Sequence, residues 1–241
     1  MQRLEDSNES QMFSTNTQDS SPIDNRILIP FEQNNLIGFK NRFGDVVIRP
    51  IYDLYLGEAQ REDDLIIVMN KRPYQYKGSK RTYNHLWYGM INGAGKVLLD
   101  TAYRDIHIQQ ADMDKIITLK DQDKGYTVLN AKLDTIVPFD RYCIIDPFDK
   151  GFARVAKWKT DSDGNPNRCW GIINYTGEEV LPCIYREVYF FFGKNRTNTL
   201  VIKKIPNSNN LECFNFYFET GQLLKSNCAP KDKGNDWCSL K

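Results

Sequence analysis

The chain has few of the side chains on which most catalytic mechanisms depend. It contains only two histidines, His85 and His107, so a Ser-His-Asp or Cys-His mechanism would have to use one of them as its base. His85 lies in a polar stretch, and His107 alternates with isoleucines, as expected for a solvent-facing position of a strand. We therefore expect no enzyme, no catalytic residue and no cofactor, and a hydrolase with a pair of carboxylates is the remaining enzymatic alternative.

Long apolar runs and a dominant charge are also missing. No apolar run approaches the ~20 residues of a membrane span, and no useful length of the chain has a helical period. The net charge is only +1, from 32 basic and 31 acidic residues, so the chain has no overall field to attract nucleic acid or a membrane. Export signals begin with basic residues followed by an apolar segment, and residues 1–25 have neither, which predicts a cytoplasmic protein.

Composition divides the chain into three parts. Residues 1–25 are polar and rich in Ser, Asn, Gln, Asp and Thr, so they cannot bury enough surface to offset their ordering entropy, and we expect a disordered tail. Residues 226–241 are similarly polar and are expected to form a cap or a tail. Residues 26–225 form the predicted folded domain, and 41% apolar content over 241 residues suffices for a sizeable core.

The six cysteines form no Cys-x-x-Cys pair and stand at irregular intervals, which excludes the usual spacing of a metal site. Their even number would permit three disulfides in an exported protein. Cys183, however, lies inside an apolar strand and Cys169 directly before one, where a small buried thiol is common. We therefore expect free thiols at the six positions Cys143, Cys169, Cys183, Cys213, Cys228 and Cys238.

Two short motifs superficially indicate ligands. The segment from Asn92 to Lys96 resembles a phosphate-binding glycine loop, but strands flank it and it falls at a hairpin turn. The segment from Asp161 to Asn167 begins like a Ca²⁺ loop but lacks the downstream bidentate acid, and its Asp-Gly and Asn-Pro pairs are ordinary turn residues. We expect both segments to be turns, without a metal.

What the sequence does contain is a repeated order of residue types. In its clearest copy the pair Trp170-Gly171 is followed by two isoleucines, the turn glycine Gly177, the run Val180-Leu181-Pro182 and then Tyr185. Residues 216–224 form a truncated fifth copy. The glycines that anchor the four fuller copies are Gly38, Gly89, Gly125 and Gly171. Their spacings of 51, 36 and 46 residues lie within the roughly 20 to 50 residues of structural repeats.

Each copy is preceded by an apolar, β-branched run of strand length, such as residues 65–69 or 115–119. One unit therefore consists of an apolar strand, a variable loop, an aromatic-glycine strand, a glycine turn, a strand ending near proline, and a Tyr-x-x-Ile tail. We predict an all-β array of about four to five antiparallel β-meander repeats in a curved propeller-like or barrel-like arrangement. Trp87 and Trp170 are expected at the aromatic position, as core wedges between units.

This order of residues resembles the WG, or KWG, β-repeat family common in bacterial proteins. The resemblance covers about residues 34–225. It departs from the family pattern in the first copy, where Ile37 replaces the tryptophan, and in the third, where Lys124 replaces it and the turn glycine is missing. The resemblance implies an all-β repeat scaffold, and it implies no reaction and no functional residues, because the family motif is structural.

Function is expected where the copies differ. The variable loop is long at residues 70–86, short at 121–123 and intermediate at 159–169, with a fourth at 206–211, and equivalent loops of an array project from one face. The longest carries five basic residues, three tyrosines and no acid between residues 71 and 85. The candidate binding residues are Lys71, Arg72, Tyr74, Tyr76, Lys77, Lys80, Arg81 and Tyr83.

Tyrosine and arginine are preferred at protein interfaces, so we predict a non-enzymatic adaptor, scaffold or neutralising module that binds another, acidic protein. Interleaved cations and aromatic rings also suit a nucleic acid or a glycan, which is the alternative. A third reading, a solvated hairpin whose charges keep an exposed edge soluble, needs no ligand at all.

Overall fold

The computed structural model describes residues 26–111, 114–149, 151–160, 164–189, 198–204 and 211–226. These residues form strands, turns and bends, which confirms the predicted all-β class. No helix occurs in this part of the chain, and hence none that is long and apolar enough to span a membrane. The polar segments predicted as tails lie outside the described residues, apart from Ser226.

The described residues form nineteen strands in five antiparallel sheets, and strands that are adjacent in a sheet are consecutive in the chain. The first sheet, unit 1, contains β1 (Leu28–Gln33), β2 (Leu36–Asn41) and β3 (Val46–Tyr52). Units 2 and 3 contain β4 (Leu54–Leu56), β5 (Leu65–Gln75), β6 (Thr82–Asn92) and β7 (Val97–Tyr103), then β8 (Asp105–Ala111), β9 (Asp114–Lys120), β10 (Tyr126–Asn130) and β11 (Thr135–Val137). Units 4 and 5 contain β12 (Ile144–Ile145), β13 (Phe152–Thr160), β14 (Pro166–Asn174) and β15 (Glu179–Tyr185), then β16 (Glu187–Tyr189), β17 (Asn198–Lys204), β18 (Leu211–Tyr217) and β19 (Gln222–Ser226).

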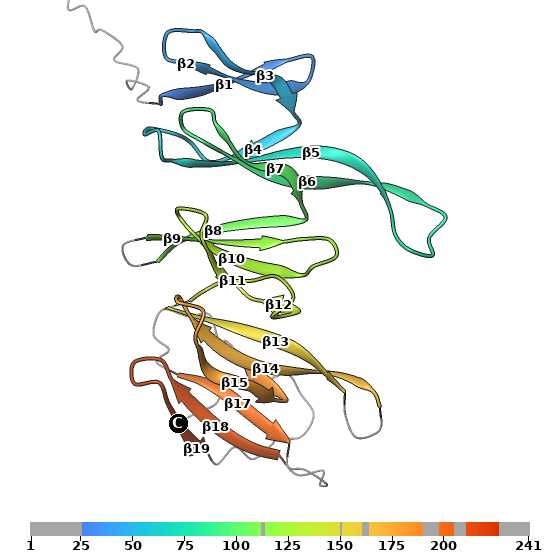
Figure 1. The fold of residues 1–241 in the computed structure, drawn as a ribbon, viewed down its shortest axis with the longest axis vertical. Coiled ribbons are helices and arrows are strands. Elements are labelled where there is room, and N and C mark those ends of the chain that lie inside the picture. Colours follow the sequence, from blue (N-terminus) through green and yellow to red (C-terminus); the bar gives the residue numbers. More distant parts are fainter. Residues whose placement is uncertain are drawn as a thin grey trace, which may run out of the picture.

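The five sheets follow one another along the longest axis of the molecule, from unit 1 at one end to unit 5 at the other (Figure 1). None of the sheets formed by the described residues closes on itself, so the propeller-like or barrel-like arrangement is not confirmed. The Tyr-x-x-Ile tail explains the continuity of the stack. Tyr103 ends β7 and Asp105 begins β8, so the tail of each unit becomes the first strand of the next sheet.

The core consists of four apolar clusters, one between each pair of neighbouring sheets. Successive side chains of a strand point to opposite faces, and here both faces are covered. Ile172 of β14 packs in the cluster between units 4 and 5, whereas the next residue, Ile173, packs in the cluster between units 3 and 4. In β9, Ile116 likewise packs in the cluster between units 3 and 4, and Ile117 packs in the cluster between units 2 and 3. Continuous apolar runs therefore mark strands that are buried on both sides.

The glycine of the aromatic-glycine pair is required by a close approach of two backbones. Between the pairs Trp170↔Tyr185 and Ile172↔Leu181, β14 advances by two residues while β15 advances by four. The extra residues form a bulge in β15 that lies opposite Gly171. A Cβ atom at Gly171 would lie 2.5 Å from the carbonyl oxygen of Leu181, which is far inside van der Waals contact. Units 1 and 2 repeat both the bulge and the crowding, at Gly38 and Gly89.

Unit 3 follows a different alignment from the one predicted. The turn asparagine of this unit is Asn130, and Thr127 stands three residues before it, as Gly171 stands before Asn174. Gly125 is therefore not the equivalent glycine. Thr127 is buried, and its hydroxyl donates a 2.6 Å hydrogen bond to the carbonyl oxygen of Val137, so a side-chain hydrogen bond takes the place of the backbone approach. The corrected spacings are 51, 38 and 44 residues.

The aromatic position is corrected in the same way. Trp170, Tyr88 and Ile37 are the residues that pair with the closing tyrosine of their units. Trp87 therefore lies one residue outside the aromatic position, and Tyr126, not Lys124, occupies it in unit 3, four residues before the turn asparagine. Trp170 is half-buried against the cluster between units 4 and 5, whereas Trp87 belongs to none of the four clusters.

An asparagine begins the last turn within each of units 1 to 4, and its side-chain oxygen accepts the N–H four residues later. Three residues after this asparagine the backbone has a positive φ, which glycine tolerates best. The residues at that position are Gly44, Gly95, Leu133 and Gly177. Leu133 takes the left-handed conformation (φ 68°) and packs beside the cluster between units 2 and 3, so the missing turn glycine of the third copy does not alter the turn.

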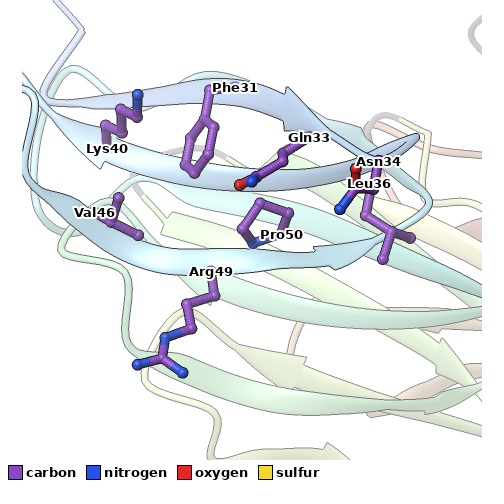
Figure 2. Close-up of a pocket in the computed structure, with 8 residues that line it drawn as sticks. All are labelled: Phe31, Gln33, Asn34, Leu36, Lys40, Val46, Arg49 and Pro50. Carbon is purple, nitrogen blue, oxygen red and sulfur yellow. The ribbon is translucent and has the colours of Figure 1, made fainter.

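Unit 1 is the first sheet of the described residues, and none of the other described sheets covers its outer face. Phe31, Leu36, Val46 and Pro50 line a shallow cavity of about 570 Å³ on this face (Figure 2). Lys40 stands directly before the turn asparagine, where units 2, 3 and 4 place an apolar residue of an inter-sheet cluster, and its ammonium group lies 4.4 Å from the centre of the Phe31 ring. A charged residue at this position gives the terminal sheet a partly polar surface, as expected for the end of a repeat array.

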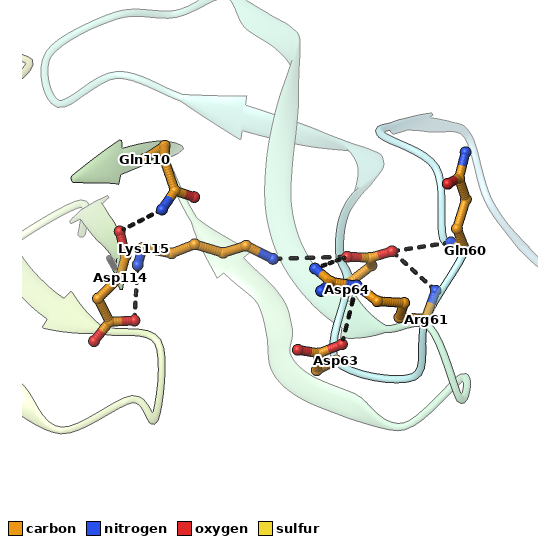
Figure 3. Close-up of polar contacts among 7 residues, drawn as sticks. All are labelled: Gln60, Arg61, Asp63, Asp64, Gln110, Asp114 and Lys115. Carbon is orange, nitrogen blue, oxygen red and sulfur yellow. Dashed lines mark hydrogen bonds and ion pairs between the residues drawn. The ribbon is translucent and has the colours of Figure 1, made fainter. Parts of the chain in front are cut away.

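Opposite charges join units 2 and 3 on one side of the stack. Asp64 accepts the backbone N–H groups of Gln60 and Arg61, and its carboxylate lies 3.8 Å from the ammonium group of Lys115 in β9 (Figure 3). Burial alone would raise the pKa of Asp64, but these hydrogen bonds and the Arg61 guanidinium outweigh it and hold the pKa below its usual value.

The close approach at Gly171 predicts a specific loss of stability. Gly171→Ala places a Cβ against the backbone of β15 and should reduce the free energy of unfolding by about 2–3 kcal/mol. Gly44→Ala is the control, because Gly44 has φ +90° but a Cβ there meets nothing within 4 Å, so only the conformational cost of ~1 kcal/mol applies. Urea unfolding followed by tryptophan fluorescence measures both. Equal losses at the two positions would contradict the crowding argument.

The lowered pKa of Asp64 predicts a pH dependence. Its contribution to stability is present above the ordinary Asp pKa of about 3.9 and is lost as the pH falls through the lower pKa of the folded state. Asp64→Asn should therefore be less stable than the natural protein at pH 7, and the difference should shrink by pH 3. Asp63→Asn, at the exposed neighbouring carboxylate, is the control. A difference that stays constant between pH 7 and pH 3 would refute this role.

Candidate functional site

The β5–β6 hairpin extends beyond its sheet as a two-stranded arm. β4 pairs with β5 only as far as Met69, and β7 pairs with β6 only as far as Tyr88. Residues 70–87, called the arm from here on, continue to pair with each other up to Gln75↔Thr82. Figure 1 shows the arm projecting from the same side of the stack as the β13–β14 hairpin, which agrees with the expectation that equivalent connections share one face.

The stretch predicted as a loop is therefore mostly strand. Lys71, Arg72 and Tyr74 belong to β5 and Tyr83 belongs to β6. The turn itself is limited to residues 76–81 and carries Tyr76, Lys77, Lys80 and Arg81. The β13–β14 connection is corrected likewise, because β13 runs to Thr160 and β14 starts at Pro166. The fourth predicted loop lies almost wholly outside the described residues.

Strand alternation separates the predicted binding residues. The cross-strand pairs Arg72↔His85 and Tyr74↔Tyr83 lie on one face of the arm, together with Trp87. Tyr76 extends this face, since its ring contacts Tyr74, Tyr83 and His85. Lys71 belongs to the opposite face, and Lys77, Lys80 and Arg81 form an exposed cationic tip. The structure thus brings four of the eight predicted residues together.

Aromatic rings hold the two strands of the arm together. The ring of Tyr74 lies edge-on to Tyr76, His85 and Trp87, with ring centres 5.1, 5.6 and 6.1 Å away. Tyr76 and Tyr83 are 5.9 Å apart and are 45% and 44% exposed. Edge-to-face pairs across strands stabilise a ladder that no flanking strand supports. The arm is therefore an ordered element with two exposed tyrosines near its tip.

Arg104 completes this cluster from the junction between β7 and β8. Its guanidinium carbon lies 5.1 Å from the ring centres of both Tyr74 and Trp87. Its Nη2 atom lies 3.3 Å from Nδ1 of His85, an arrangement in which Nδ1 accepts and the histidine proton is on Nε2. Sequence reasoning missed Arg104, although it stands beside Tyr103, the residue that pairs with Tyr88.

Two guanidinium groups share this face without a carboxylate. Arg72 donates from Nη2 to the hydroxyl of Thr101 in β7 at 2.6 Å, which ties the arm to its sheet. Neither Arg72 nor Arg104 forms an ion pair with any residue that the structure describes. Both arginines therefore use neutral acceptors and aromatic rings.

Three buried nitrogen atoms of the same cluster have no hydrogen-bond partner among the described residues. They are Nε2 of His85, Nε1 of Trp87 and Nη1 of Arg104. Leaving a buried donor unpaired costs about 1–3 kcal/mol for each group, and more when the group is charged. Native structures satisfy nearly all such groups, so each of these three calls for an acceptor, for which a water molecule suffices.

A polar cavity of about 740 Å³ lies between units 3 and 4. The short β9–β10 turn, with Asp121 and Lys124, lines one side, and Trp158 and Arg168 of the β13–β14 hairpin line another. The Arg168 guanidinium lies 4.9 Å from the ring of Trp158, which is 58% exposed. These residues add a second pair of aromatic and cationic side chains to the side of the stack that carries the arm.

The wall of this cavity is held by a network around Glu179. Its Oε1 atom accepts hydrogen bonds from the Tyr142 hydroxyl at 2.7 Å and the Lys157 ammonium at 2.6 Å. Burial and the bond to Glu179 raise the pKa of Tyr142. Burial tends to raise the pKa of Glu179, but its bonds from Lys157 and Tyr142 outweigh this and lower it. The polar groups of Glu179, Tyr142 and Lys157 thus have partners within the network, and we interpret the network as structural.

The other residues weighed for chemistry are the cysteines and His107. Cys143, Cys169, Cys183 and Cys213 form no disulfide, and burial followed by the charge of Glu179 raises the pKa of Cys183 to about 12, which disfavours a reactive thiolate. Cys228 and Cys238 lie outside the described residues. His107 is exposed on β8, as predicted.

The two motifs weighed as ligand loops fall at hairpin connections. Asn92 to Lys96 forms the turn between β6 and β7, closed by the Asn92 side chain, which agrees with the prediction. The first three residues of the segment weighed as a Ca²⁺ loop, 161–163, are outside the described residues, and Pro166 and Asn167 belong to β14. Within the described part of the chain no three His, Cys, Asp or Glu side chains are grouped as metal ligands.

Comparison with known proteins identifies the repeat. A family model described as the WG containing repeat matches residues 170–197, which begin at the aromatic position of unit 4. No curated protein and no solved structure matches the chain. Units 1 and 2 share the glycine, the bulge, the asparagine turn and the closing tyrosine of unit 4. The chain therefore carries a WG containing repeat at residues 170–197.

Proposed function

We propose that this array is a non-enzymatic interaction module, an adaptor, scaffold or neutralising partner, that binds another protein through the arm. The observation that carries the proposal is that the arm stays paired and ordered outside the stack while contributing nothing to the four inter-sheet clusters. A preformed hairpin loses little conformational entropy on binding, which favours its use as a contact surface.

The chemistry of the arm favours an acidic protein segment as the partner. Five basic residues and no acid occur between residues 71 and 85, and the tip residues Lys77, Lys80 and Arg81 are exposed. Exposed Tyr76 and Tyr83 add amphipathic rings of the type enriched in interfaces. Positive charge at the rim steers an acidic partner toward these rings.

The second candidate function is binding of a single-stranded nucleic acid or a glycan. It is favoured by the spacing of exposed tyrosines between cations on one short element, because rings can stack on bases or sugars while cations contact phosphate or sulfate. The β13–β14 hairpin, with Trp158 and Arg168, would extend either kind of contact along the same side.

Charge reversal at the tip tests the proposed function. The triple change Lys77→Glu, Lys80→Glu and Arg81→Glu should abolish capture of a partner that the natural protein retains from a lysate of its source. The matched control reverses Arg42, Lys96 and Lys132, which are exposed cations of the β2–β3, β6–β7 and β10–β11 turns. Proteins found with the natural chain and the control, and lost with the arm variant, are then purified and titrated directly.

A purified protein that binds the natural chain at least tenfold more tightly than the arm variant supports the proposal. Parallel titrations with a single-stranded oligonucleotide and a sulfated glycan test the alternative. If either polymer depends on the arm while no purified protein does, the second candidate replaces the first. If neither a protein nor a polymer distinguishes the arm variant from the control, the arm is not the contact.

A further inference from the structure

Three N–H groups at the base of the arm have no hydrogen-bond partner among the described residues. Trp87 Nε1 and Arg104 Nη1 are donors by their chemistry, and His85 Nε2 becomes one when Nδ1 accepts from Arg104. All three therefore lack the same thing, an acceptor. They belong to one place, since Arg104 lies over the Trp87 ring and within hydrogen-bond distance of His85.

The acceptor that fits this place carries a negative charge. Arg104 is always protonated and has no ion-pair partner among the described residues. Arg72, on the same face, adds a second guanidinium. Hydrogen bonds from a charged donor to a charged acceptor are about twice as strong as neutral ones, so an anion gains most from this set of donors.

We propose that the base of the arm binds one carboxylate group, with Arg104 as its anchor and Trp87 and His85 as the other donors. The inference rests on the proposed function: the carboxylate belongs to an Asp or Glu side chain of the acidic segment that the arm contacts. It assigns a defined point of recognition inside the arm, distinct from the cationic tip.

A carboxylate fits better than a phosphate for two reasons. The two oxygens of a carboxylate can accept up to four hydrogen bonds, enough for the three N–H groups, and its single charge matches that of Arg104, the guanidinium with a buried unpaired donor. Arg72 is exposed to solvent and donates to Thr101, so the buried donors of this place carry one positive charge, that of Arg104. The flat carboxylate also suits a site bordered by the rings of Tyr74 and Trp87.

Tyr76 lies beside the His85 end of this site. Its ring lies 5.3 Å from His85 and 5.1 Å from Tyr74, and it is 45% exposed. Because Tyr76 follows the last residue of β5, its side chain can turn toward solvent without breaking the ladder.

The indole N–H of Trp87 provides a direct probe of this site. In the ¹⁵N-labelled full chain, its signal is assigned by Trp87→Phe and followed during titration with sodium acetate, at ionic strength held constant with sodium chloride. We expect a saturable downfield shift of the Trp87 signal, while the signals of Trp158 and Trp170 stay in place and report an intact fold. Arg104→Gln should weaken the response at least tenfold.

Two further variants keep the result interpretable. Arg104→Lys retains the charge and should keep a weaker response. Such a response would show that Arg104→Gln loses binding because the charge is removed, and not because the site unfolds. Arg42→Gln, at the exposed β2–β3 turn of unit 1, should leave the response unchanged. A Trp87 signal that ignores acetate, an acetate response that survives Arg104→Gln, or a response to inorganic phosphate as large as that to acetate would each overturn the proposal.

The failure of this inference is distinguishable from that of the proposed function. If reversal of the tip charges abolishes partner binding while Arg104→Gln leaves it intact, the arm is the contact and the carboxylate anchor is wrong. If acetate shifts the Trp87 signal through Arg104 while no partner depends on the arm, the anchor stands as a site for small carboxylates and the proposed function is wrong.

Discussion

Each inner sheet of this protein has two apolar faces, and both must be covered. An antiparallel sheet commonly packs one face and leaves the other to water, but adjacent residues such as Ile172 and Ile173 point to opposite sides and are both fully buried. A sheet of this kind is stable only between two others, so the units stack. The same constraint explains Lys40, the charged residue that replaces an apolar one where the stack ends at unit 1.

Within units 1, 2 and 4, the last strand must pass very close to the strand before it. The bulge opposite Gly171 brings the two backbones closer than any side chain allows, and this is the physical reason for the glycine of the family motif. Unit 3 reaches the same architecture with Thr127, whose hydroxyl bonds to the carbonyl of Val137. A glycine is therefore one residue that fits between the paired strands at this position, and a threonine whose hydroxyl donates a hydrogen bond is another.

The hairpin tips on one side of the stack lie outside the clusters, so packing does not restrict their length. Unit 2 uses this freedom to build the arm, which replaces the missing flanking strands with contacts among Tyr74, Tyr76 and His85. Arg104 joins the arm to the next unit and leaves donors unpaired at its base. The features that suggest binding thus occur where the repeat has no packing role, which is consistent with a scaffold that carries its function on one side.

The sequence by itself determined the all-β class, the repeated unit, the strand runs and the turn glycines, because a period of two and a positive φ are local properties. Only the tertiary structure decided the open stack, the alignment of Thr127, and the arm in place of a loop, because these depend on strand register and on contacts between sheets. Four of the eight predicted binding residues share one face of the arm, a grouping that strand pairing created. Arg104 could not be predicted, because it joins His85 and Trp87 only through the pairing of β6 with β7.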